Sequence, residues 1–230
     1  MFSTNPPDNI CAEATRYALL RRLVPAMLHN MAGALQPIGM TAAIMEKRLQ
    51  TATPDLLSLT KSGGNIKTLS REASTTFMDL MTWLAPKGTP RVAVNAGIED
   101  TLGMVSTELA FRGFTVVNET ANICAEVPQN ILRSVYLAGL MAVTDAAQSS
   151  GQVALRARAA ADEILLEIEF TAIGNESVLG GLQTYRKIDW DDVRFLARAE
   201  GVGIEHTGNK VTMRIDNRAV TAPSPNRSSL

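Results

Sequence analysis

The first part of the chain carries apolar residues at the spacing of one long amphipathic helix. Between Cys11 and Gln50 they recur at intervals of three and four positions, which places them on one helix face. The stripe consists of Leu20, Val24, Met27, Met31, Ala34, Ile38, Ala42, Met45 and Leu49. We therefore predict a helix over residues 11–50. Pro25 and Pro37 are expected to disturb its axis, because each lacks a backbone donor.

A second helical pattern follows a turn at residues 51–54 and continues to about Leu84. Its apolar positions are Leu59, Ile66, Ala73 and Leu80 at seven-residue spacing, with Leu69 and Thr76 between them. Thr53 is expected to cap this helix and Pro54 to occupy its first position, while Gly63–Gly64 should bend it locally. Residues 11–85 are thus predicted to form a helical hairpin, preceded by a flexible N-terminus at residues 1–10.

The two stripes of such a hairpin cannot both be buried by the hairpin alone. Pairing of two copies into a four-helix bundle would cover them, so we expect a homodimer. Packing of the stripe on the second domain of the same chain is the alternative.

The period of the pattern changes after a Pro- and Gly-containing linker at residues 86–90. Short strands are predicted at residues 92–94, 114–117, 152–158, 163–171, 203–206 and 210–215, and helices at residues 96–112, 128–147 and 188–201. This order predicts a two-layer α/β sandwich with a mostly antiparallel or mixed sheet over residues 91–216. Residues 217–230 are polar and are expected to form a disordered tail. The expected fold class is therefore α+β.

Composition narrows the possible functions. The chain has 230 residues and a net charge of −1, so its overall charge gives no reason to expect nucleic-acid binding. It contains neither a run of eighteen apolar residues nor a basic-then-apolar leader, so we expect a cytoplasmic protein without a membrane span. Cys11 and Cys124 are expected to be free thiols, and no zinc-ligand spacing occurs. We predict neither a resident metal nor a cofactor.

His29 is the candidate for chemistry. At roughly 100° per residue it points about 180° away from the apolar stripe, so it should face outward. Its neighbours are small, and the nearby cations favour an anionic visitor. The residues expected to dock a partner are Arg21, Arg22, Ala26, Asn30, Gly33, Gln36 and Met40. A solvated helix face is the alternative for this group.

Four segments resemble the core of histidine kinases over residues 13–216. Residues 29–38, HNMAGALQPI, look like the phospho-accepting box in its variant with proline eight positions after the histidine. Residues 142–153, AVTDAAQSSGQV, resemble the end of the N-box helix and the strand after it. Residues 167–174 stand where the nucleotide-binding Asp-x-Gly-x-Gly box follows its strand, and residues 189–215 resemble the last helix and hairpin. The resemblance implies a Bergerat-like sandwich after a phosphotransfer hairpin.

The departures from the family pattern remove the groups that would bind ATP. Ala142 stands at the magnesium-binding asparagine and has no oxygen ligand, and Phe170 at the adenine-binding aspartate cannot accept a hydrogen bond. Ala172 replaces the first glycine of that box, and the sequence after Gly180–Gly181 is not glycine-rich. Asn30 stands where kinases carry a carboxylate base, and an amide cannot remove a proton at neutral pH. We therefore predict neither ATP binding nor autokinase activity.

A phosphorylatable histidine beside a sandwich without nucleotide motifs resembles the ChpT-type histidine phosphotransferases. This resemblance implies that His29 relays a phosphoryl group between aspartates of receiver domains of response regulators, with magnesium supplied by the receiver. Gly33 replaces the residue that orients water in phosphatase versions, so intrinsic phosphatase activity is not expected. Two alternatives stay open: a pseudokinase scaffold that binds a response regulator or kinase without transfer, and a plain structural dimer.

Overall fold

The computed structural model describes residues 6–84, 88, 90–160, 162–177 and 185–217. The chain forms two compact units. We call Leu23–Gly88 the hairpin unit, and Met1–Arg22 together with Thr89–Leu230 the sandwich unit. The predicted α+β class, a helical hairpin followed by an α/β sandwich, is confirmed. The first turns of the first helix belong to the sandwich unit, although the sequence pattern placed residues 11–22 in the hairpin.

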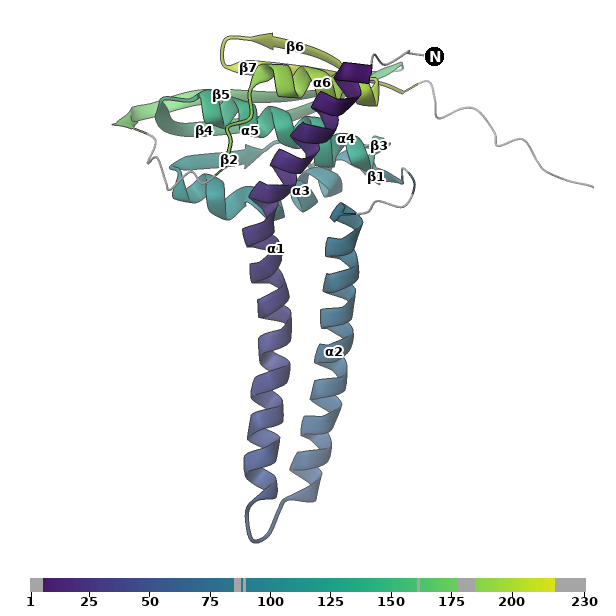
Figure 1. The fold of residues 1–230 in the computed structure, drawn as a ribbon, viewed down its shortest axis with the longest axis vertical. Helices are drawn as coiled ribbons and strands as arrows, with labels where there is room; N and C mark the ends of the chain where they lie inside the picture. The colour runs from purple at the N-terminus through teal and green to yellow at the C-terminus, as the bar shows by residue number, and fades with distance from the viewer. Residues whose placement is uncertain (1–5, 85–87, 89, 161, 178–184, 218–230) are drawn as a thin grey trace, which may run out of the picture. The chain divides into compact units, whose positions relative to one another are not determined.

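The hairpin unit consists of two long antiparallel helices joined by a turn (Figure 1). Helix α1 (Pro6–Leu49) continues through both prolines and begins at residue 6, so residues 6–10, predicted to be flexible, are helical. Helix α2 (Leu56–Leu84) buries Leu59, Ala73 and Leu80 of its predicted stripe.

The predicted cap of α2 is wrong. The Asp55 carboxylate accepts from the N–H groups of Leu57 and Ser58 at 3.0 and 3.2 Å, so Asp55 caps α2 rather than Thr53. A single carboxylate here satisfies two of the helix's unpaired backbone donors.

The sandwich unit contains a five-stranded sheet among its described residues, in the order β2-β4-β5-β7-β6. The strands are β2 (Phe114–Asn118), β4 (Ser149–Ala159), β5 (Glu163–Ser177), β6 (Gly203–Thr207) and β7 (Lys210–Asp216). β2 pairs with β4 in parallel and the other pairs are antiparallel, so the sheet is mixed, as predicted. β1 (Arg91–Ala93) pairs separately with β3 (Glu126–Pro128), a strand that the sequence pattern did not predict.

The helices of the sandwich unit cover one face of this sheet (Figure 1). They are α3 (Val94–Phe111), α4 (Gln129–Ile131), the π-helical turn Leu132–Tyr136, α5 (Leu137–Ala146) and α6 (Trp190–Glu200). The covered face presents alternate apolar residues of the strands, including Val153, Leu155, Ile164, Leu166, Ile168, Val211 and Met213, all fully buried. In β7 the buried residues alternate with less buried ones, as expected for a strand with one covered face.

The first turns of α1 pack within the sandwich unit. Ala12 and Thr15 are fully buried, and Leu19 is nearly so. The Thr15 hydroxyl donates to the Asp192 carboxylate at 2.9 Å, and Arg16 pairs with Glu200 at 2.6 Å. These contacts join the start of α1 to α6.

The carboxylate of Asp192 also accepts from the N–H of Asp189, the N-cap of α6, and is expected to make folding sensitive to acid. Burial alone would raise the pKa of Asp192, but bonds from Arg186, the Asp189 N–H and Thr15 outweigh it and lower that pKa. Since the folded pKa lies below the unfolded value of about 3.9, the stabilisation is present above pH ~4 and is lost as the pH falls through the folded pKa. Urea unfolding between pH 6 and pH 2 should show this loss. Asp192→Asn should flatten that part of the profile, and an unchanged slope would contradict the assignment.

Candidate functional site

His29 lies on α1 of the hairpin unit with its side chain exposed. It stands about 200° around the helix from Met27, a buried residue of α1. Asn30, Gly33 and Gln36 are exposed, Ala26 is half-buried, and Met40 is 59% exposed. The hairpin therefore presents the imidazole on its outer surface, together with five of the seven residues predicted to dock a partner.

The backbone one turn after His29 is also accessible. A Cβ built on Gly33 would meet nothing within 4 Å, so the helix surface is open at this position. Pro37 has no N–H, and the carbonyl oxygen of Gly33 therefore lacks its usual helical donor. The site offers a visiting molecule a ring nitrogen, a free backbone acceptor and little steric hindrance.

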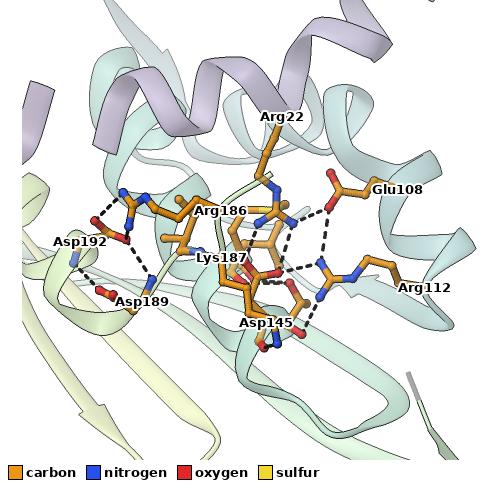
Figure 2. Close-up of polar contacts among 12 residues, drawn as sticks. Arg22, Glu108, Arg112, Asp145, Arg186, Lys187, Asp189 and Asp192 are labelled. Carbon is orange, nitrogen blue, oxygen red and sulfur yellow. Dashed lines mark hydrogen bonds and ion pairs between the residues drawn. The ribbon is translucent and has the colours of Figure 1, made fainter. Parts of the chain in front are cut away.

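The two arginines predicted to dock a partner behave differently. Arg21 is exposed, and its guanidinium lies over the Tyr185 ring at 5.9 Å from the centroid. Arg22 is only 7% exposed, so the prediction that it lies on an open surface is wrong. The reason is packing, because carboxylates of α3 and α5 enclose its guanidinium (Figure 2).

Asp145 at the end of α5 is the centre of this enclosure. Its carboxylate pairs with Arg22 at 2.5 Å and with Arg112 at 2.9 Å, and it accepts from the Ile188 N–H at 2.9 Å. Arg112 also donates to the Thr144 carbonyl at 2.8 Å, and Arg22 bonds Glu108 (Figure 2). We call Arg22, Glu108, Arg112 and Asp145 the arginine–carboxylate cluster. The Asp145 side chain is 1% exposed.

The charges of the cluster balance one another, although the Nε atoms of Arg22 and Arg112 have no hydrogen-bond acceptor among the described residues. Burial alone would lower the pKa of Arg22, but hydrogen bonds and charge from Asp145 and Glu108 raise it, so the guanidinium stays cationic. Two cations face two anions, which leaves no surplus charge to attract a phosphate group. The cluster is therefore a structural feature rather than a second binding site. No local pattern predicts this cluster, because Arg22 and Asp145 lie 123 residues apart in the chain.

The positions that the sequence resemblance assigns to a nucleotide site carry none of the expected ligand groups among the described residues. Ala142 is buried at 1% exposure, and Phe170 packs its ring edge against Phe114 at 6.0 Å between centroids. Ala172 pairs with Gly151 across the β4–β5 ladder. The Gly180–Gly181 segment lies outside the described residues. The residues that are described supply neither a metal ligand at position 142 nor an acceptor for adenine at position 170.

We expect Mg–ATP at millimolar concentration to leave the melting temperature of this protein unchanged. A ligand that binds only the folded state would raise that temperature by mass action. Differential scanning fluorimetry with and without Mg–ATP measures this, with a nucleotide-binding kinase as positive control. A saturable upward shift would contradict our interpretation of Ala142 and Phe170.

Other candidate features carry no ligand signal. Within the described residues, no group of three His, Cys, Asp or Glu side chains could hold a metal ion, and no helix is long and apolar enough to cross a bilayer. Cys11 and Cys124 are free thiols. His206 on β6 stacks on Trp190, with 3.6 Å between ring centroids, and its Nε2 lies 2.8 Å from the Gly208 carbonyl oxygen.

Comparison with known proteins gives structural neighbours only. No family model and no curated protein matches the chain. A histidine kinase from Burkholderia phymatum STM815 is 17% identical, with 86% of this chain and 96% of that chain covered and a TM-score of 0.42. A bacterial phosphotransferase is 15% identical, with 85% and 94% covered and a TM-score of 0.39. The histidine kinase ThkA, solved in complex with the response regulator protein TrrA, is 13% identical, with 93% and 67% covered and a TM-score of 0.42.

Proposed function

We propose that this protein is a histidine phosphotransfer protein that relays a phosphoryl group between receiver-domain aspartates through His29, without binding ATP. The observation that carries the proposal is the exposed imidazole of His29 on the outer face of the hairpin unit, beside the open helix surface at Gly33. A relay needs an accessible nucleophile and little else, because the receiver brings the phosphoryl group and its magnesium ion.

In the proposed phosphoryl transfer, His29 reacts as a neutral imidazole. A ring nitrogen lone pair of His29 attacks the phosphorus of an aspartyl phosphate in line, and the P–O bond breaks with its electron pair leaving on the receiver's carboxylate. The second half is the reverse reaction with another receiver, whose aspartate attacks the phosphohistidine and regenerates His29. Neither half requires a base on this chain, so Asn30 in place of a carboxylate is compatible with the relay.

We also propose that the hairpin unit, Leu23–Gly88, pairs with a second copy as a four-helix bundle. Large apolar side chains on its surface lack a partner in one chain, notably Leu28, Leu35, Leu49, Phe77 and Met78, at 45% exposure or more. A groove of about 400 Å³ between α1 and α2 is lined by Met31, Ala34, Leu35, Ile38, Ser70, Ala73, Ser74, Phe77 and Met78. A contiguous apolar surface of this kind marks an interface, and bundle formation would fill the groove.

The relay is tested by transfer from a phosphorylated partner. A receiver domain charged with labelled phosphate is mixed with the full chain, magnesium is then chelated, and the label is followed on each protein. Acid-labile and alkali-stable label on this chain, which a second receiver can discharge, is the result we expect. Label that never leaves the first receiver would overturn the proposal.

Because Asn30 is not a carboxylate, a second candidate function stays open, that of a pseudokinase scaffold. If the first step requires assistance from a carboxylate beside the histidine, the protein would hold a receiver or kinase on the same face without accepting phosphate. Binding of the receiver by titration calorimetry, combined with no transfer of label, would identify the scaffold.

A further inference from the structure

The carbonyl oxygen of Gly33 lacks the hydrogen bond that a helix normally supplies. In an α-helix each carbonyl accepts from the N–H four residues later, and for Gly33 that residue is Pro37, which has no N–H. The Thr41 hydroxyl, one turn further along α1, donates to the Pro37 carbonyl at 2.8 Å rather than to Gly33. A helical carbonyl without its usual donor takes its hydrogen bond from water or from a bound molecule instead.

This acceptor lies on the same side of α1 as His29. At about 100° per residue, Gly33 stands roughly 40° and Gln36 roughly 20° from His29 around the helix axis. A helical carbonyl points along the axis toward the following turn, so the Gly33 oxygen lies close to the level of Gln36. All three residues are exposed, and a Cβ at Gly33 would meet nothing within 4 Å. A molecule that covers the imidazole can therefore also reach this oxygen.

This stretch of α1 can recognise a visiting molecule only through neutral groups. From Leu23 to Met45 the helix contains no Asp, Glu, Lys or Arg residue. The polar groups that it offers around the imidazole are the side-chain amides of Asn30 and Gln36 and the carbonyl of Gly33. The carbonyl is already fixed by the helix, so a hydrogen bond to it orders no side chain, unlike one to either amide.

We propose that the Gly33 carbonyl is a positioning acceptor for the receiver domain, taking a hydrogen bond from an N–H group that the receiver presents beside its phosphorylated aspartate. The proposal rests on the proposed function and adds the chemistry that orients the docked receiver. Pro37 keeps the acceptor free, because every other residue at this position would supply an N–H that occupies it. The bond takes no part in phosphoryl transfer itself, so its loss affects receiver binding rather than the limiting rate.

Two replacements of Pro37 differ only in the group that faces the acceptor. Pro37→Ala supplies an N–H, whereas lactic acid, the α-hydroxy acid analogue of alanine, places an ester oxygen at the same point when it is introduced by stop-codon suppression. Both remove the proline ring, so both relax a bend of α1 equally. Calorimetric titration of the full chain with receiver domains charged with beryllofluoride and magnesium gives the dissociation constant. Transfer from the phosphorylated receivers gives KM and the limiting rate.

We expect Pro37→Ala to raise the dissociation constant and the KM for the receiver about fivefold, the effect of one neutral hydrogen bond, with the limiting rate unchanged within about twofold. The lactic-acid variant should bind the receiver like the wild type. Equal weakening by both replacements would assign the effect to the proline ring and overturn the proposal. Pro25→Ala is the control, because it restores an N–H to α1 on the N-terminal side of His29. It should change the dissociation constant by less than about twofold, and an effect equal to that of Pro37→Ala would also overturn the proposal.

The two readouts separate this proposal from the relay. Normal transfer with unchanged receiver binding in Pro37→Ala would refute the acceptor and leave the relay through His29 intact. Weaker binding in Pro37→Ala, in a chain that never accepts label, would refute the relay and support the acceptor. A chain that binds none of the receiver domains would overturn both.

Discussion

Asp145→Ala is expected to lower the free energy of unfolding of the sandwich unit by about 3–5 kcal/mol, because it removes the carboxylate that two buried arginines share. The Asp145 carboxylate binds both Arg22 and Arg112, whose side chains are 5% and 6% exposed. Glu108 contacts both arginines but is 31% exposed, so one carboxylate must then balance two cations. The loss also removes the acceptor for the Ile188 N–H, which lies just before α6.

Urea unfolding followed by circular dichroism measures this change. Asp191→Ala is the matched control, because Asp191 pairs with Arg194 at 2.8 Å on the surface with 75% of its side chain exposed. An exposed pair contributes little, so the control should change the unfolding free energy by less than about 1 kcal/mol. Equal effects of the two variants would mean that the arginine–carboxylate cluster does not stabilise the fold as its burial indicates.

Most elements of the fold could be predicted from periodicity alone. The strands around residues 152–158 and 163–171 alternate apolar and polar side chains because one face of the sheet is buried, and both are present as β4 and β5. Among the heptad positions of α2, Leu59, Ala73 and Leu80 are buried. β3 was missed because three residues are too few to establish a period. The start of α1 was placed too late because residues 6–9, with the sequence PPDN, carry no apolar stripe.

The candidate site could be predicted only in part, for a physical reason. Helix geometry places Arg22 and His29 on one face of α1, and it cannot tell where along that face other parts of the chain pack. Arg22 is enclosed and His29 is exposed, although the two are seven residues apart on that face. Burial of an arginine depends on carboxylates that the sequence supplies 86 and 123 residues later, at Glu108 and Asp145. Local pattern therefore predicted the exposure of His29 correctly and misjudged the exposure of Arg22.

His29→Ala should abolish acceptance of the phosphoryl group, lowering the initial rate of transfer from a phosphorylated receiver by at least about a thousandfold. The imidazole is the nucleophile of the proposed relay, and alanine offers no group that can attack phosphorus. Because the His29 side chain is exposed, the variant should fold normally, with an unchanged melting temperature. Loss of transfer would then reflect chemistry rather than unfolding.

His206→Ala is the control that makes this assignment specific, since His206 is the other histidine of the chain and is likewise exposed. It should accept phosphate at the wild-type rate, because its ring lies against Trp190 and the Gly208 carbonyl of the β6–β7 hairpin rather than on α1. Gel quantification of acid-labile label on all three proteins over the first seconds of mixing gives the rates. Retention of label by His29→Ala, or its loss in His206→Ala, would move the reactive group away from the hairpin unit and refute the relay through His29.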